Sequence, residues 1–476
     1  MSGHRHTRRT KIVCTIGPAS SSPETIRRLI EAGMDVARLN FSHGNHETHG
    51  RAIHDLRRAS QELNREIGIL MDLAGPKIRL GEIPELERIL EPDTRVKLVS
   101  GPHASGDELP VNYPWLYEDV EEGDRILLAD GQVELCVMDK KNQALHCQVI
   151  VGGTVSSHKG VNLPTSQLRI PTFTDKDRRD LEFGLARGVD MVAMSFVRHE
   201  NDLTPLIEIL NRMDRPPLLI AKIEKPDALE RFQKILRSVG GAMVARGDLG
   251  VEMPLEEVPL IQKRIIQETR MAGKVVITAT QMLRSMMSSP RPSRAEVTDV
   301  ANAILDGTDA VMLSDETAMG RYPVEAVKVL DRICQATEPA LNEERFLQEG
   351  LSELLPLTAA AISRAATWLA RDLNPAAIVA ATTSGSTARL IARYRPPLPV
   401  VGLTPELSTC RQLCLSWGVV PVLISACDNA DEMLNQVRHW VQEKGMVKSG
   451  DRLIVTAGMP FRVPGTTNLL KVIEIE

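Results

Sequence analysis

Several kinds of residue are scarce in this chain, and each scarcity excludes a class of protein. Aromatic residues make up only 3% of the 476 residues, too few for the stacking surfaces that bind single-stranded nucleic acid. The formal net charge is −5, so no strong positive field favours nucleic acid in general. No stretch approaches the roughly 20 apolar residues of a membrane span. We therefore expect neither nucleic-acid nor membrane partners.

The cysteine content is also low, with seven scattered cysteines and no CxxC pair. An odd number of isolated cysteines argues against a disulfide framework and a zinc site, and favours reduced thiols. The apolar run behind the basic N-terminal stretch is too short for a signal peptide. Together these features predict a cytoplasmic protein.

What the chain does contain is a regular alternation of short apolar runs with helical patterns. Eight such runs begin at Lys11, Asp35, Ile67, Met191, Leu218, Gly241, Val275 and Ala310. Short runs that are apolar throughout are typical of strands buried on both faces. Eight of them alternating with helices predict an α/β fold, the (β/α)8 TIM barrel.

One long interval breaks this alternation and predicts a second part of the protein. Between residues 79 and 164, short alternating runs with Gly and Asp turns predict antiparallel strands. We expect a small β-barrel lid domain at 75–164, inserted after the third strand of a catalytic barrel at 1–74 and 165–340. A second α/β rhythm predicts a C-terminal open-sheet domain at 341–476.

Chemistry in a (β/α)8 barrel takes place at the C-terminal ends of the strands, so polar residues there are candidates. A single charge at a strand end is commonly a solvated loop residue, but all of these ends meet at one mouth. The polar residues at the predicted ends are Arg38, Asn40, Ser42, Asp72, Ser195, Lys222, Glu224, Arg246, Asp248, Thr280, Ser314 and Glu316.

Two of these residues predict a divalent metal site. Lys222 and Glu224 lie two residues apart on one strand, so their side chains share a face. Glu224 together with Asp248 from the next strand gives two carboxylates, which suit Mg²⁺ or Mn²⁺. The alternative is a simple Lys222–Glu224 ion pair.

Positive charge at the same mouth favours phosphoryl transfer. Arg38, Arg79 and Lys222 would match the charge of a transferred phosphoryl group, and Gly247 lets the backbone approach a ligand. Neither a Walker loop nor a GxGxxG motif is present, so a P-loop or Rossmann nucleotide site is not supported.

Two other stretches offer weaker signals. His43, His46 and His49 recur at three-residue spacing, which indicates either a metal cluster or the ordinary start of a surface helix. In the C-terminal part, a hydroxyl-rich stretch follows a buried strand and opens a helix, which predicts either a phosphate cradle or a plain helix cap. It comprises Thr382, Thr383, Ser384, Gly385, Ser386 and Thr387, and no acid, base or metal pair accompanies it, which favours an effector site.

Long stretches of the sequence, taken in order, resemble the pyruvate kinase family over nearly the whole chain. They include TKIVCTIGPAS, ARLNFSHG, DLAGPKIR, KGVNLP, AKIEKP, MVARGDLGVE, ITATQML and MLSDETAMGRYPVEAV. The resemblance implies a glycolytic enzyme that transfers phosphate from phosphoenolpyruvate to ADP, giving pyruvate and ATP. It also implies Mg²⁺ as cofactor, a homotetramer, and an allosteric C-terminal domain.

The same resemblance implies roles for individual residues. Lys222 would stabilise the transition state, and Glu224 and Asp248 would bind Mg²⁺. Thr280 and Ser314 would be candidates for the proton donor. The phosphoenolpyruvate contacts would be Arg38, Gly247, Asp248 and Thr280, and the nucleotide contacts Arg79, Lys159 and His43. The monovalent-cation site would comprise Asn40, Ser42, Asp72 and the carbonyl of Leu73.

Two departures from the family pattern carry predictions. Lys77 stands where K⁺-dependent members usually have Glu, and Leu73 where they have Thr. We predict that the Lys77 ammonium replaces K⁺, so that K⁺ is not required; the alternative is that Lys77 points to solvent and K⁺ still binds. Gly458 and Met459 stand where members that bind fructose 1,6-bisphosphate have Trp and Arg, which favours a sugar or nucleotide monophosphate as effector.

Two other functions remain open at this point. One is a barrel lyase acting on phosphoenolpyruvate or pyruvate, which would have no use for Arg79 and Lys159. The other is a metabolite sensor without activity, which the presence of Lys222, Glu224 and Asp248 disfavours.

Overall fold

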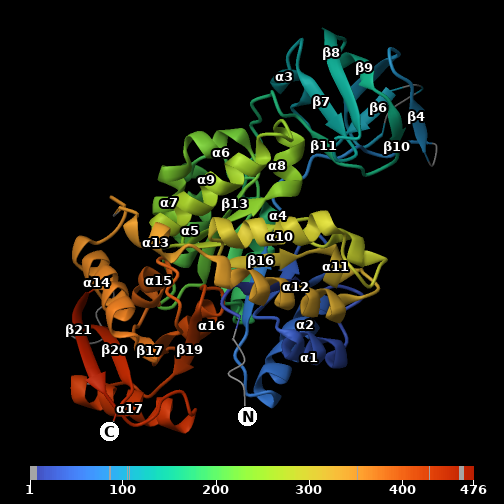
Figure 1. Cartoon of the computed structure of the whole chain (residues 1–476). Coiled ribbons are helices and arrows are strands. Elements are labelled where there is room, and N and C mark those ends of the chain that lie inside the picture. The colour runs from blue at the N-terminus through green and yellow to red at the C-terminus, as the bar shows by residue number, and fades with distance from the viewer. Residues whose placement is uncertain are drawn as a thin grey trace.

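The computed structural model describes residues 8–84, 87–103, 106, 108–350, 352–427, 429–459 and 466–475. A barrel lies at the centre, a part made mainly of strands stands beyond one side of it, and a C-terminal α/β part packs on another side (Figure 1). No helix within these residues is long and apolar enough to cross a bilayer.

The central part is a closed barrel of eight parallel strands in the order β1-β16-β15-β14-β13-β12-β3-β2, which confirms the predicted barrel. Nearly every strand residue is buried, because helices cover the outside and side chains fill the inside. The strands are β1 (Lys11–Thr15), β2 (Val36–Asn40), β3 (Gly68–Asp72), β12 (Met191–Met194), β13 (Leu218–Ile223), β14 (Gly241–Ala245), β15 (Val275–Ala279) and β16 (Ala310–Leu313).

Amphipathic helices connect the barrel strands and pack on their outer faces. Ser22, Thr174 and Ser293 each begin one of these helices by accepting a backbone N–H of the first turn. The helices are α1 (Pro23–Ala32), α2 (His46–Glu62), α4 (Asp175–Ala186), α5 (Thr204–Leu210), α6 (Pro226–Glu230), α7 (Phe232–Ser238), α8 (Arg246–Glu252), α9 (Val258–Met271), α10 (Arg294–Asp306), α11 (Asp315–Ala318) and α12 (Pro323–Thr337).

The chain between β3 and β12 forms a six-stranded sheet, in the order β11-β7-β8-β9-β5-β6, and a separate pair, β10-β4. Its elements are β4 (Arg88–Leu90), β5 (Arg95–Ser100), β6 (Glu108–Val111), α3 (Leu116–Asp119), β7 (Arg125–Leu128), β8 (Val133–Lys141), β9 (Ala144–Val151), β10 (Gly153–Val155) and β11 (Val161–Asn162). The ladders are antiparallel except for β5 and β6, which are parallel. Single bridges from Arg79 to Gly160 and from Leu80 to Val111 join the two edges, so the sheet curls into a small barrel.

The two segments that connect this sheet to the large barrel are bonded to each other. The N–H of Leu80 donates to the carbonyl of Lys159 at 2.8 Å, and the N–H of Val161 donates to the carbonyl of Ile78 at 3.0 Å. Just before this ladder, Gly75 has φ +64°, and a Cβ there would lie 2.8 Å from the Phe196 ring. The connection therefore begins at a turn that glycine alone accommodates without strain.

The C-terminal part is a five-stranded sheet in the order β19-β18-β17-β20-β21, parallel except for β21. Cys414 and Leu415, after α16, join the apolar cluster that fills the interior of the large barrel, so this part packs closely against it. The elements are α13 (Glu343–Gln348), α14 (Leu357–Leu373), β17 (Ala377–Ala381), α15 (Ser386–Ala392), β18 (Val400–Thr404), α16 (Leu407–Leu413), β19 (Val419–Leu423), α17 (Ala430–Glu443), β20 (Arg452–Gly458) and β21 (Thr467–Glu474).

Candidate active site

The mouth of the barrel contains a lysine whose ammonium is held by three oxygens. Nζ of Lys222 donates to Oγ of Ser195 at 2.7 Å, pairs with Oε1 of Glu224 at 2.8 Å, and lies 3.4 Å from Oδ1 of Asp72. Burial alone would lower the pKa of Lys222, but the carboxylates of Asp72, Glu224 and Asp248 outweigh it and raise the pKa. The ammonium is therefore charged and fixed in direction at neutral pH.

The two candidate metal ligands, Glu224 and Asp248, follow the adjacent strands β13 and β14. The other oxygen of Glu224 accepts the N–H of Phe196 at 2.7 Å, which fixes the carboxylate. Burial raises the pKa of Glu224, and the negative charge of Asp248 adds to that rise while Lys222 opposes it. The sequence suggested that Asp248 ends a strand, and this prediction is wrong. Strand β14 stops at Ala245, and Asp248 lies in the first turn of α8.

This donor set fits a hard divalent cation with few protein ligands. Among the residues that the structure describes, no group of three or more His, Cys, Asp or Glu side chains has the arrangement of a metal site. Mg²⁺ commonly takes only one or two carboxylates and fills its other positions with water and substrate oxygens. Glu224 and Asp248 meet that requirement, and the Lys222–Glu224 ion pair weighed as an alternative is also present.

The metal interpretation of the three histidines is wrong. Nε2 of His46 pairs with Asp180 at 2.8 Å, and the His46 ring stacks on Phe183. Nε2 of His49 bonds the carbonyl of His43 at 2.8 Å, and its ring stacks on Phe41. His46 and His49 are thus engaged separately at the start of α2, and His43 lines a cleft instead.

Arg38 lies beside the lysine cluster and is fixed by two neighbours. Its Nε donates to Oδ2 of Asp72 at 2.7 Å, and one terminal nitrogen donates to Oγ1 of Thr15 at 3.0 Å. Burial would raise the pKa of Asp72, but Lys222 and Arg38 outweigh it and lower the pKa. Thr15 was not singled out from the sequence, although a polar residue ending the first apolar run was a usable signal.

The candidate cation ligands Asn40, Ser42, Asp72 and Leu73 come from the neighbouring ends of β2 and β3, where Asn40 pairs with Asp72. The N–H of Ser42 donates to the Asn40 side-chain oxygen at 3.1 Å, and Ser195 donates to the carbonyl of Leu73 at 2.8 Å. These two oxygens are thus already engaged by the chain itself.

The loop after β15 has an unusual backbone. Thr280 and Gln281 have φ of +75° and +59°, in the left-handed region that a β-branched residue rarely adopts. A Cβ on Gly247 would lie 2.7 Å from Cγ2 of Thr280, so only glycine lets the two segments approach.

Ser314 and Glu316 follow the next strand, β16. Glu316 is buried and accepts the N–H of Ser314 at 2.7 Å and that of Leu283 at 3.0 Å, so it ties two loops together. Asp315, between them, is exposed at the start of α11.

A cleft with about 1150 Å³ of empty space lies between the barrel and the inserted sheet. His43, Lys77, Arg79, Lys159 and Asp248 are among the residues that line it. Arg79 donates to the carbonyl of His158 at 2.8 Å. Burial and the positive charges of Lys77, Arg79 and Arg38 lower the pKa of His43, so this histidine is neutral at neutral pH.

Lys77 is exposed, yet the charges of the catalytic mouth act on it. Although part of the side chain reaches solvent, protein around the ammonium desolvates it. This desolvation and the charge of Lys222 lower the pKa of Lys77, while the carboxylates of Asp248 and Glu224 oppose that fall. The sequence left open whether this side chain leads to the mouth or to bulk water. The structure places it on the wall of the cleft that also contains Asp248.

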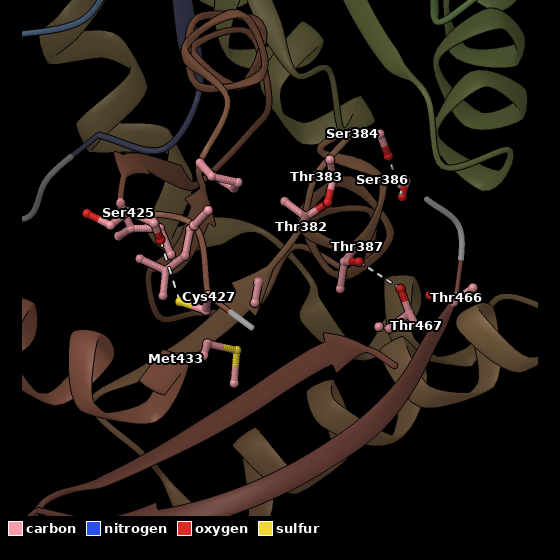
Figure 2. A pocket seen from close by; sticks show the side chains of 16 residues that line it. Thr382, Thr383, Ser384, Ser386, Thr387, Ser425, Cys427, Met433, Thr466 and Thr467 are labelled. Carbon is pink, nitrogen blue, oxygen red and sulfur yellow. Dashed lines mark hydrogen bonds between the residues drawn. The ribbon is translucent and has the colours of Figure 1, made fainter. Parts of the chain in front are cut away.

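A second pocket, of about 630 Å³, lies in the C-terminal part (Figure 2). Its hydroxyl groups come from Thr382, Thr383, Ser384, Ser386 and Thr387, from the neighbouring Thr466 and Thr467, and from Ser425 away from these. Thr387 and Thr467 are hydrogen-bonded to each other at 2.7 Å. Gly385 does not line it, but its N–H is held by Oγ1 of Thr382 at 2.9 Å. No charged side chain is among its described lining residues. Within the TAGMPFRVPG segment, Gly458 lines the pocket, and residues 460–465 lie outside the described residues.

Comparisons with known proteins agree with this architecture. Residues 7–327 match the family model "Pyruvate kinase, barrel domain", and residues 360–473 match "Pyruvate kinase, alpha/beta domain". The pyruvate kinase of Geobacillus stearothermophilus is 45% identical over 469 residues, which are 98% of this chain and 80% of the relative. That of Clostridium acetobutylicum is 42% identical over 471 residues, 98% of this chain and 100% of the relative.

A solved structure gives the same result. The crystal structure of a pyruvate kinase from Cryptosporidium parvum matches with a TM-score of 0.92 at 34% identity, covering 99% of this chain and 97% of that one. The chain therefore belongs to the pyruvate kinase family of phosphotransferases.

Proposed function

We propose that this chain transfers the phosphoryl group of phosphoenolpyruvate to ADP at the mouth of the barrel, giving pyruvate and ATP. The observation that carries the proposal is the ammonium of Lys222, which is largely buried, charged and held between Ser195 and Glu224. A fixed cation at this place matches the charge that develops on a transferred phosphoryl group.

In this reaction an oxygen of the ADP β-phosphate forms a bond to phosphorus while the bond from phosphorus to the enol oxygen breaks. Lys222 stabilises the negative charge on the phosphoryl group and then on the enolate oxygen. Arg38 and the backbone of Gly247 orient phosphoenolpyruvate. A proton, delivered from the side of Thr280 or Ser314, is added to the enolate carbon and gives pyruvate.

Glu224 and Asp248 would hold a divalent cation, Mg²⁺ or Mn²⁺. When bound, the ion neutralises phosphate charge and lowers the barrier to transfer. The repulsion between the buried carboxylate of Glu224 and the half-buried carboxylate of Asp248 supports this assignment, because a cation between them would relieve it.

We assign the parts of the chain to the predicted domains. Residues 1–74 and 165–340 form the catalytic barrel, 75–164 a lid that closes over substrates, and 341–476 the regulatory domain. Arg79 and Lys159 reach the cleft from the lid side and, with His43, would hold the nucleotide phosphates. Closure of the lid would bring these cations toward the barrel and exclude water.

We also propose that turnover does not require K⁺. Lys77 lines the same cleft as Asp248, and the charges of Lys222, Asp248 and Glu224 shift its pKa. Its ammonium supplies a monovalent positive charge on the wall of this cleft, while the carbonyl of Leu73 already accepts a hydrogen bond from Ser195.

The pocket in the C-terminal part is proposed to bind a phosphorylated effector with one phosphate group, a sugar or nucleotide monophosphate. Its hydroxyls suit one phosphate, and its described lining offers no charged side chain for a second. Phosphoenolpyruvate saturation curves with glucose 6-phosphate, ribose 5-phosphate, AMP and fructose 1,6-bisphosphate test this. A response to the bisphosphate alone contradicts it.

A homotetramer is proposed as the assembly. Within the described residues, β21 pairs with a strand on one side only, and Val472 on it is 40% exposed. An exposed strand edge is a template for pairing with a second copy. Light scattering after gel filtration would give the mass of four chains; a monomer mass contradicts the proposal.

The decisive experiment measures pyruvate in a coupled assay with and without ADP. We expect pyruvate and ATP to form in equal amounts and only when ADP is present. Pyruvate formed without ADP would instead mean transfer of the phosphoryl group to water. No pyruvate under any condition would contradict the kinase and leave the lyase and the sensor.

A further inference from the structure

We propose that Arg246 is a positioning residue for the reaction, which clamps the loop after β15 so that Thr280 faces the substrate. The proposal rests on the assignment of Thr280 to the substrate site. In this proposal Arg246 does not contact the substrate. It affects the reaction only by holding the backbone of Ala279 and Thr280.

The clamp consists of the guanidinium of Arg246, which donates hydrogen bonds to the backbone carbonyls of two successive residues. Nε of Arg246 donates to the carbonyl of Ala279 at 3.2 Å, and one terminal nitrogen donates to the carbonyl of Thr280 at 2.7 Å. The same terminal nitrogen also contacts the sulfur of Met282. The side chain thus spans the loop from the last residue of β15 to the residue after Gln281.

The other side of the guanidinium is anchored outside the loop. The second terminal nitrogen pairs with Oδ1 of Asp299 on α10 at 2.6 Å and also donates to Oε1 of Gln262 on α9 at 3.3 Å. Gln262 is fixed in turn by donating to Asp306 at 3.0 Å. Arg246 therefore connects the catalytic loop to two outer helices, α9 and α10.

The loop requires such a clamp because its backbone is locally unfavourable. Thr280 is β-branched and has φ +75°, and Gln281 follows with φ +59°. Backbone of this kind persists only where surrounding contacts impose it. With both carbonyls held, the Thr280 side chain lies against Gly247, the residue that precedes Asp248 in the chain.

Arginine suits this position better than lysine. A planar guanidinium donates along several fixed directions at once, whereas an ammonium offers a single point of charge. One side chain here serves two carbonyls, a sulfur and a carboxylate. Replacement by lysine keeps the charge but loses the fork, which makes Arg246→Lys the informative variant.

The experiment compares R246K, T280A and the double variant in the ADP-dependent assay. We expect R246K to lower kcat about 100-fold while KM for phosphoenolpyruvate changes little, because a misplaced reacting group costs rate more than binding. If Arg246 acts through Thr280, the same substitution in the T280A background lowers kcat by less than about threefold. NMR of deuterium exchange into the pyruvate methyl group gives a second readout, which should fall in parallel.

A matched control is available on the far side of the barrel. Arg57 also grips one carboxylate and two carbonyls, with Asp190 at 2.7 Å, Gly188 at 2.9 Å and Ile67 at 3.1 Å. R57K removes an equivalent fork away from the site, so kcat should stay within about twofold. If R246K fails to fold, D299N takes its place, because it removes only the anchor, and it should lower kcat about tenfold.

The outcomes separate this proposal from the proposed function. Equal losses for R246K in the native and T280A backgrounds contradict a role through Thr280. A large loss for T280A with near-normal R246K and D299N overturns the clamp and leaves the function standing. Full activity of T280A removes Thr280 from the substrate site, and with it both the clamp and that part of the proposed function.

Discussion

The charge at position 77 offers the sharpest test of the proposal that turnover does not require K⁺. Changing Lys77 to Glu replaces the proposed built-in cation with the residue that K⁺-dependent members carry. The native chain should turn over equally well in K⁺ and in tetramethylammonium. K77E should lose activity in tetramethylammonium and recover most of it when K⁺ is supplied.

The size of the effect follows from the charges around Lys77. The charges of Lys222, Asp248 and Glu224 all act on it, so it is within electrostatic reach of the reacting phosphate. Two unit charges ~6 Å apart interact by roughly 3 kcal/mol at an effective dielectric constant of 20. Because Lys77 is exposed, solvent screening reduces this to about 1 to 3 kcal/mol, or about 10- to 100-fold in kcat/KM.

The assay measures kcat/KM for phosphoenolpyruvate in the two salts at constant ionic strength. Lys97 is an exposed lysine on β5 of the inserted sheet, so K97E makes the same change of charge at a site that does not line the cleft. K97E should behave like the native chain. The reasoning fails if K77E is insensitive to K⁺, or if native turnover collapses in tetramethylammonium.

Three further predictions follow from the same geometry. K222M should lower kcat by about 10³-fold or more with an unchanged thermal unfolding curve, and a near-normal rate would remove Lys222 from the mechanism. E224Q should raise the Mg²⁺ concentration for half-maximal activity at least about tenfold; an unchanged Mg²⁺ titration would contradict its role as ligand. Burial would raise the pKa of Asp35, but Arg8, Lys11 and Arg65 lower the pKa to about 2, below its unfolded value near 4. The Asp35 carboxylate therefore stabilises the fold above pH 4, and that stabilisation is lost as the pH falls toward 2. D35N should therefore reduce the unfolding free energy by about 2 kcal/mol at pH 7, and the difference from the native chain should shrink toward pH 2; a pH-independent difference in urea unfolding would contradict this.

The barrel was predictable because its strands are buried on both faces. The strand beginning at Val275 contains no charged residue, and few other structures produce eight such runs. The positions of Arg38, Asp72 and Lys222 followed from the same reasoning, since parallel strands of a barrel all end at one mouth.

Other features could not be read from the sequence because they depend on distant contacts. The left-handed backbone of Thr280 is contacted by Arg246 at the start of α8, which pairs in turn with Asp299 of α10, and nothing in the local sequence favours it. The helix that contains Asp248 begins with Arg-Gly-Asp, residues of mixed or low helix propensity, so a strand end was the more natural prediction. The link from Lys222 through Ser195 to Leu73 joins three different segments, and only folding brings them together.

The paired connections of the inserted sheet have a consequence for protein engineering. Because Ile78 and Val161 are hydrogen-bonded neighbours, the chain leaves the barrel and returns to it at one point. An insertion with adjacent ends can be added or removed without stretching its host. A short turn from Ile78 to Val161 would therefore excise residues 79–160 in one step and yield a minimal barrel that keeps Lys222, Glu224 and Asp248. Such a shortened chain would separate, in a single molecule, what the barrel does to phosphoenolpyruvate from what the lid does for the nucleotide.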